Sequence, residues 1–146
     1  MEQVVRPARK VVGEVRVPGE VGAAVQAVVL ATLAEGEGRV LNAPPAVDGL
    51  IAVLGRLGVT AERRGREVVV AGHGVRGFEP PSEPLDLGPA GEAGLLLVAL
   101  LAGQSFATRL APLPAAERLP PLLGYLTAMG AAVDQADGTL TVGGGP

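Results

Sequence analysis

The stretch VRVPGEVGAAVQAVVLATLAEGEGRVLNAP, residues 15–44, sets out the elements from which this chain is built. Residues 11–17 are rich in valine and alternate at their end with polar residues, which is typical of a strand that Pro18-Gly19 terminates. Residues 21–34 are apolar almost all round, which predicts a helix buried on most of its faces. The stretch therefore begins a strand–helix unit with a largely buried helix.

The residues that follow complete a module over about residues 14–72. A short strand is expected at residues 38–44, and Asp48 is a favourable N-cap for a helix at residues 49–57. Arg64-Gly65-Arg66 then separates two strand-like runs, as in a β-hairpin. The predicted order is strand, helix, strand, helix, strand, strand.

The same order returns in a second module, at about residues 85–144, after a Pro-rich connector at about residues 78–84. The spacing of the glycines expected to end the helices supports a duplication. Gly36 and Gly103 would end the first helix of each module, and Gly58 and Gly130 the second. The second module is predicted to contain a strand at residues 85–88, a helix from Pro89 to residue 101, a strand at 104–110, a helix at 117–129 and a hairpin around Asp137-Gly138.

The expected fold is a single α/β domain, residues 1–146, made of two β-α-β-α-β-β modules with helices inside and sheets outside. The run LLLVALL, residues 95–101, is predicted to be fully buried. A doubly wound parallel sheet is the alternative. The tight turns between paired strands argue against it, because parallel neighbours need long crossovers.

Composition excludes several kinds of function. The net charge is −3 and there is no basic stripe, which argues against nucleic acid or a membrane surface as a partner. Lys10 is the only lysine, so a Schiff-base or P-loop lysine is nearly excluded. Without cysteine there is no disulfide, thiol chemistry or cysteine-bound zinc. With no membrane-spanning stretch and no signal-peptide core, a cytoplasmic protein without a cofactor is expected.

Isolated polar residues offer little chemistry. His73 is the only histidine and is predicted to be a solvated turn residue, since one histidine without clustered carboxylates makes no metal site. A catalytic triad would need His73 to meet Ser82 or Ser105, and neither serine lies in a Gly-x-Ser-x-Gly turn. We therefore expect neither a metal site nor a catalytic residue.

Three further features are predicted to be structural. The run ERRGRE, residues 62–67, is expected to be a solvated hairpin tip, with its arginines flanked by glutamates. Asp86 is expected to stabilise the local chain, and Tyr125, on a helix between leucines, to belong to the core.

Three segments of the chain resemble the enolpyruvyl transferases, in particular 5-enolpyruvylshikimate-3-phosphate (EPSP) synthase. They are residues 15–44, residues 83–106 (EPLDLGPAGEAGLLLVALLAGQSF) and residues 122–133 (LLGYLTAMGAAV). The resemblance implies an inside-out α/β barrel with helices in the centre. It also implies enzymes of two domains, each of three modules, which react phosphoenolpyruvate with shikimate 3-phosphate in the cleft between them.

The charged residues of the family's motifs are replaced in this chain. The family holds the phosphate and carboxylate groups of its substrates with lysine, serine and arginine side chains. The positions that match them are Val21, Gly22 and Gln26 in the first motif, Leu95 in the second, and Leu113 and Glu117 in the third. Binding such anions requires several charge-assisted hydrogen bonds, so the resemblance implies the frame of the site without its chemistry.

A vestigial ligand site is expected around the Gly-rich starts of two helices. Glu20 and Glu92 lie in the first turns of these helices, where each carboxylate stabilises the helix start and repels a second anion. The candidate residues are Gly19, Glu20, Gly22, Gly88, Gly91 and Glu92.

The expected function is a non-catalytic interaction or scaffold protein, a pseudoenzyme relative of EPSP synthase. Its expected partner is a second copy, as a homodimer, or a protein that covers the missing third module. One alternative is half of a split enolpyruvyl transferase of the shikimate pathway, completed by a partner chain. Another is a small-molecule sensor, which Glu20 and Glu92 would bias toward neutral or cationic ligands.

Overall fold

The computed structural model describes residues 17, 19–112 and 117–144. The strand predicted at residues 11–17 therefore lies outside the described residues except for Val17, and so does Leu113 of the third motif.

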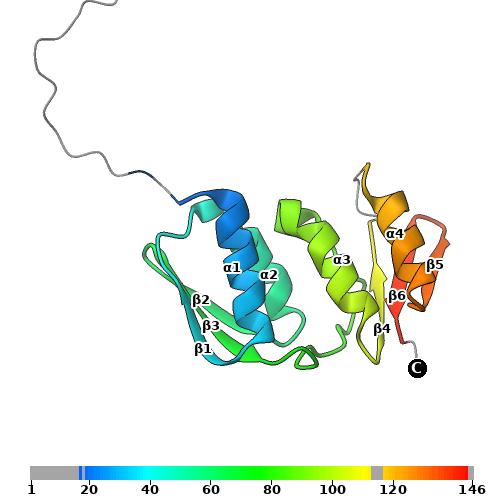
Figure 1. The fold of residues 1–146 in the computed structure, drawn as a ribbon, viewed down its shortest axis with the longest axis horizontal. Coiled ribbons are helices and arrows are strands. Elements are labelled where there is room, and N and C mark those ends of the chain that lie inside the picture. Colours follow the sequence, from blue (N-terminus) through cyan, green and yellow to red (C-terminus); the bar gives the residue numbers. More distant parts are fainter. Residues whose placement is uncertain (1–16, 18, 113–116, 145–146) are drawn as a thin grey trace, which may run out of the picture.

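The first half of the chain folds into two helices on a three-stranded sheet (Figure 1). The strands are antiparallel in the order β1-β3-β2, and the hairpin predicted at Arg64-Gly65-Arg66 is confirmed, with Gly65 at φ 63°. The elements are α1 (Val21–Leu33), β1 (Glu35–Val40), the 3-10 helix η1 (Pro45–Val47), α2 (Asp48–Gly55), β2 (Thr60–Arg64) and β3 (Glu67–His73).

The second half repeats this arrangement, with the strand order β4-β6-β5. Its hairpin turns at Asp137 and Gly138, with φ values of 49° and 73°, as predicted. The strand predicted at residues 85–88 is reduced to one parallel bridge between Leu85 and Leu110. The elements are the 3-10 helix η2 (Gly88–Ala93), α3 (Gly94–Ala102), β4 (Ala107–Leu110), α4 (Leu119–Ala128), β5 (Val133–Ala136) and β6 (Thr139–Gly143).

Glycines at matching places let the helices lie close to the sheets. A Cβ atom at Gly72 in β3 would stand 2.3 Å from the carbonyl oxygen of Ala31 in α1. A Cβ atom at Gly143 in β6 would stand 2.6 Å from the carbonyl oxygen of Leu101 in α3. The same device in both halves fits the duplication read from the sequence.

The helices lie between the two sheets in Figure 1, where α1, α2 and α3 fill the centre and α4 lies against the second sheet. Their contact surfaces form one core, whose largest fully buried side chains include Leu50, Leu54, Leu97 and Leu101. No described helix is both long and apolar enough to cross a lipid bilayer.

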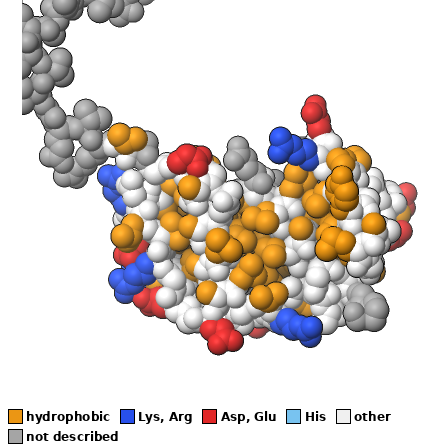
Figure 2. All heavy atoms as spheres, in the orientation of Figure 1, with side chains coloured by type: hydrophobic (Ala, Val, Ile, Leu, Met, Phe, Trp, Pro, Cys, Tyr) orange, Lys and Arg blue, Asp and Glu red, His pale blue; other side chains and the backbone are white. Residues whose placement is uncertain are grey.

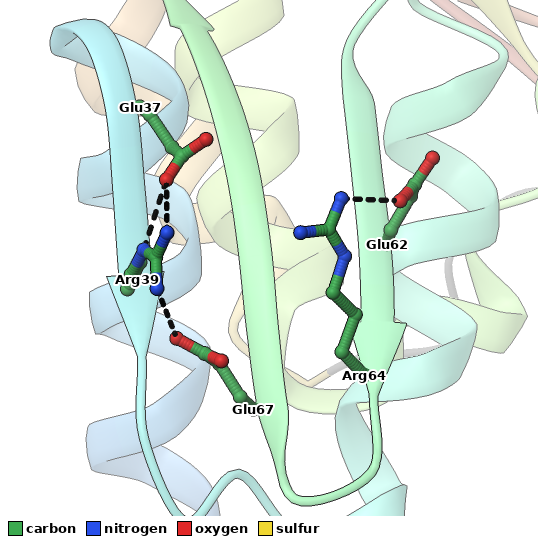
Figure 3. A network of polar contacts seen from close by, with 5 residues as sticks. All are labelled: Glu37, Arg39, Glu62, Arg64 and Glu67. Atoms are coloured by element: carbon green, nitrogen blue, oxygen red, sulfur yellow. Dashed lines mark hydrogen bonds and ion pairs between the residues drawn. The ribbon is translucent and has the colours of Figure 1, made fainter.

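The outer face of the first sheet is charged. Arg39 pairs with Glu37 at 2.9 Å and with Glu67 at 3.6 Å, and Arg64 pairs with Glu62 at 3.1 Å (Figure 3). Alternate strand residues point to opposite faces, so these pairs face solvent while the apolar residues between them face the helices. The charges mark this face as the outside of the sheet.

Several predicted boundaries are wrong. The strand predicted at residues 38–44 is β1, Glu35–Val40, so Gly36 lies in a strand and ends no helix. The helix predicted from Pro89 is interrupted at Gly91, whose φ of 54° divides it into η2 and α3. Asp48 is the first residue of α2 and not its N-cap, because η1 leads directly into this helix.

Burial is also less complete than the sequence predicts. In α3, Leu96 is 37% exposed, although its run was expected to be fully buried. In α1, Leu30 is 65% exposed, and Tyr125 in α4, expected in the core, is 72% exposed. Each of these side chains is thus only partly covered by described residues.

Candidate functional site

A groove of about 490 Å³ opens where the N-terminal halves of α1, α3 and α4 meet. Figure 2 shows the face that carries these helices, with apolar side chains spread across it and most charged groups at its edges. The residues that line the groove are Gly22, Val25, Gln26, Leu95, Leu96, Ala99, Arg118 and Leu122. Such a groove accepts apolar groups, and Arg118 is the one cationic residue among the described residues that line it.

Glu20 occupies the N-terminus of α1, the helix end where an anion would bind. Its backbone is extended, and its carboxylate accepts hydrogen bonds from the backbone N–H groups of Gly22 (2.7 Å) and Ala23 (2.5 Å). These bonds, that from Ala23 first, hold the pKa of Glu20 below its ordinary value. The helix-stabilising role predicted for Glu20 is confirmed, and the carboxylate fills the position of an external anion.

The two glycines beside Glu20 have different surroundings. Gly22 lines the groove, and a Cβ atom there would stand 3.3 Å from the Glu20 carboxylate oxygens. Gly19 packs against the chain after β1, since a Cβ atom there would lie 2.2 Å from the carbonyl oxygen of Asn42. Gly19 is therefore needed for close packing, and Gly22 leaves room for the Glu20 cap.

Gly88 and Gly91 of the second Gly-rich segment are not among the described residues that line the groove. The N–H of Gly88 donates to Asp86 Oδ1 at 2.8 Å, which confirms a local structural role for Asp86. Gly91 provides the kink before α3. Glu92 lies in η2, and its side chain is outside what the structure describes.

The structure brings several motif positions together at the groove and adds one residue that the sequence analysis missed. Gln26 and Leu95, which replace the family's arginines, line the groove. Glu117 is exposed just before α4, and the next residue, Arg118, lines the groove instead. The sequence feature that could have revealed Arg118 is its position, one residue after Glu117, which matches the family's arginine.

A second cavity of about 240 Å³ lies between the C-terminal halves of α3 and α4. It shares Ala99 with the groove, and Gln104 at its edge donates to the carbonyl oxygens of Val75 (3.1 Å) and Leu100 (3.2 Å). Gln104 is thus engaged in fixing the chain. The lining residues are Ala99, Ala102, Gly103, Gln104, Leu126, Met129, Gly130 and Ala131.

The prediction that residues 62–67 form a solvated hairpin tip is wrong for Arg63. Arg64 and Arg66 are exposed, but Arg63 points to the inner side of the sheet and only 24% of its side chain is accessible. Its guanidinium donates to Asp48 Oδ1 at 2.5 Å and to the carbonyl oxygens of Ala43 (3.0 Å) and Pro44 (2.9 Å). Arg63 is a structural clamp between β2 and the start of α2.

The remaining polar candidates stay at the surface. His73, Ser82 and Ser105 are all exposed. In the part of the chain that the structure describes, no group of three or more histidine, aspartate and glutamate side chains could hold a metal ion.

Known proteins resemble this chain in sequence and in fold. The sequence profile of EPSP synthase (3-phosphoshikimate 1-carboxyvinyltransferase) matches residues 5–143. The 3-phosphoshikimate 1-carboxyvinyltransferase of Alkalilimnicola ehrlichii is 40% identical, over 99% of this chain and 34% of that enzyme. The solved EPSP synthase of Acinetobacter baumannii superposes with a TM-score of 0.79 at 24% identity, over 91% of this chain and 32% of that structure.

These matches define the class and then the family. The fold, with its groove between helix N-termini, is that of an enolpyruvyl-transferase-like α/β domain. The chain belongs to the EPSP synthase family. It spans about a quarter to a third of the length of the curated relatives that it matches.

Proposed function

We propose that this chain is a non-catalytic interaction domain of the EPSP synthase family, one that does not bind the phosphate of a shikimate-like substrate. The observation that carries the proposal is the Glu20 cap. Two N–H groups at the start of α1 already hold a carboxylate, and their hydrogen bonds lower the pKa of this group, which is ionised at neutral pH even at its ordinary value. A substrate anion would have to displace it against electrostatic repulsion.

The chemistry of the groove supports the proposal. Recognition of a phosphate or carboxylate in proteins relies on arginine, lysine and several aligned donors. Here the residues at the matching positions of the first two motifs are Val21, Gly22, Gln26 and Leu95, none of which carries a charge. Among the described residues that line the groove, Arg118 is the only charged one.

The described part of each half contains two α-helices and a three-stranded antiparallel sheet. We propose that each half is one β-α-β-α-β-β module, with its helices toward the centre and its sheet outside, as in part of an inside-out barrel. The role is that of a scaffold, in the cytoplasm, whose partners bind the helical face.

Calorimetric titration with shikimate 3-phosphate at low salt, with and without phosphoenolpyruvate, tests this function. No binding heat at millimolar ligand is expected. Glu20→Ser keeps a capping side chain while removing the charge, so it should permit weak phosphate binding if Glu20 is the obstacle. Micromolar binding by the unaltered chain would overturn the proposal.

Arg118 favours a second function, half of a split enolpyruvyl transferase whose other cations come from a partner chain. It lies one residue after the position of the family's arginine and lines the groove beside Gly22 and Gln26. Under this function, an assay of the chain with its candidate partner would show transfer activity that Arg118→Gln abolishes. Activity that is unchanged by Arg118→Gln would exclude this role for the residue.

A further inference from the structure

The face made by α1, α3 and α4 carries large apolar side chains that the described residues leave partly exposed. Helix α3, with the sequence GLLLVALLA, has no polar side chain, and α1 has only Gln26 and Thr32. Helices that are apolar all round are normally buried on all sides. Yet Leu96 is 37% exposed and Leu30 is 65% exposed.

Helix α4 extends this face with residue types that anchor protein interfaces. Tyr125 is 72% exposed and Met129, four residues further along the helix, is 81% exposed. Aromatic residues and methionine are enriched in protein–protein interfaces, and large exposed apolar patches mark binding surfaces. Apolar side chains spread across this face in Figure 2.

The three helices run in the same direction. In Figure 1 each begins at the upper edge of the molecule and descends, with α3 between α1 and α4. Glu20 is the N-cap residue of α1, and Arg118 is the N-cap residue of α4. An acidic and a basic group therefore stand at the same end of the face, on opposite sides of α3.

This arrangement makes the face complementary to itself. A twofold axis that lies in the face and runs along α3 keeps the helices parallel and exchanges their sides, so α1 of one copy lies opposite α4 of the other. The Glu20 carboxylate of each copy then meets the Arg118 guanidinium of the other copy, while the apolar side chains pack together. A twofold axis across the helices would bring helix starts to helix ends and make no such pair.

We propose that the chain forms a homodimer through the α1–α3–α4 face, with Glu20 of each copy paired to Arg118 of the second copy. This inference rests on the proposed interaction function and names its partner. The proposed function and the proposed dimer can fail separately. Phosphate binding would overturn the proposal that Glu20 blocks the start of α1, and it would not affect the proposal of a dimer. A monomer would overturn the dimer and leave the blocked helix end unaffected.

Sedimentation equilibrium across a concentration series tests the face. The unaltered chain is expected to be a dimer, and Leu96→Glu to weaken dimerisation by about tenfold or more, because the new carboxylate would be buried without a partner. Leu41→Glu is the matched control, since Leu41 is 73% exposed, follows β1 and belongs to none of the three helices. A monomer at all concentrations, or equal weakening by both variants, overturns the proposal.

Charge exchange tests the axis. Glu20→Lys and Arg118→Glu, made singly, place like charges opposite one another and should each weaken the dimer. The double variant Glu20→Lys/Arg118→Glu should restore much of the lost affinity for the second copy. If the single variants acted only by disturbing folding, the double variant would instead show the sum of their two losses. Circular dichroism of each variant separates unfolding from dissociation. The pairing is overturned if the dimer of the double variant dissociates at least as readily as that of the single variant with the lower dimer affinity.

Discussion

Arg63 on β2 holds Asp48 at the start of α2, with Nε and Oδ1 2.5 Å apart. The same guanidinium binds the carbonyl oxygens of Ala43 and Pro44, so it fixes the chain that leads from β1 into the helix. Its neighbour Arg64 points to the opposite, solvent-exposed face, and among the described residues its one ion-pair partner is Glu62. Adjacent arginines thus have unequal structural importance.

Replacing Arg63 by Met should lower the free energy of unfolding by about 1–3 kcal/mol, because partly buried carbonyl groups lose a charged donor. Arg64→Met, the neighbouring control, should change it by no more than about 0.5 kcal/mol, as expected for an exposed ion pair. Urea denaturation measures both. Equal effects would mean that the Arg63 clamp contributes nothing beyond surface charge.

Gly49 sets the distance between the two halves of the domain. A Cβ atom there would stand 1.7 Å from the carbonyl oxygen of Pro89 in η2. Gly49→Ala should therefore lower the free energy of unfolding by about 3 kcal/mol or more, because backbone must move. In the same helix, nothing lies within 4 Å of a Cβ atom at Gly55, so Gly55→Ala should raise stability by about 0.5–1 kcal/mol. Thermal denaturation measures the stability of both variants. Equal destabilisation of Gly49→Ala and Gly55→Ala would contradict this account.

Two buried threonines should respond in opposite ways to the same substitution. The Thr108 hydroxyl is buried and has no hydrogen-bond partner among the described residues. Thr108→Val should raise the free energy of unfolding by about 1 kcal/mol, because it removes an unsatisfied polar group without changing the shape. The Thr32 hydroxyl donates to the carbonyl oxygen of Val29 at 2.7 Å, so Thr32→Val should lower stability by about 0.5–1.5 kcal/mol. Urea midpoints that shift in the same direction would exclude this difference.

The Glu20 cap should make stability depend on pH. Its pKa is lower in the folded chain, so the folded state binds fewer protons than the unfolded state. The stabilisation is complete above the ordinary glutamate pKa of 4.5 and is lost as the pH falls through the lowered value. Comparison of urea midpoints for the unaltered chain and Glu20→Gln should give a difference that is largest near neutral pH and disappears in acid. A difference independent of pH would rule out the ionised cap.

The sequence predicts the elements whose signals are local. Gly65 and Gly138 adopt the left-handed backbone that their hairpins need, and Glu20 caps the helix that follows it. Gly91, in contrast, has a φ of 54° and divides the helix predicted from Pro89 into η2 and α3. No sequence pattern indicated that kink.

The parts of the site that were missed depend on long-range neighbours. Arg63 looked like a surface residue because its partner Asp48 lies 15 residues away in the chain. Arg118 was overlooked because the family's arginine falls on Glu117, and both residues precede α4, where the sequence does not show which side chain lines the groove. Tyr125 was expected in the core because its helix is apolar, although only part of that helix is covered.

The central claim is that Glu20 takes the place of a substrate anion, and the amide resonances of Gly22 and Ala23 test it most directly. We would titrate the ¹⁵N-labelled chain with shikimate 3-phosphate at low salt and follow these two N–H groups by NMR, with Glu20→Ser as the comparison. The account predicts no shift of either amide in the unaltered chain, and shifts of both in the variant. Saturable shifts of both amides in the unaltered chain would contradict it, because a substrate anion would then reach the helix end that Glu20 holds.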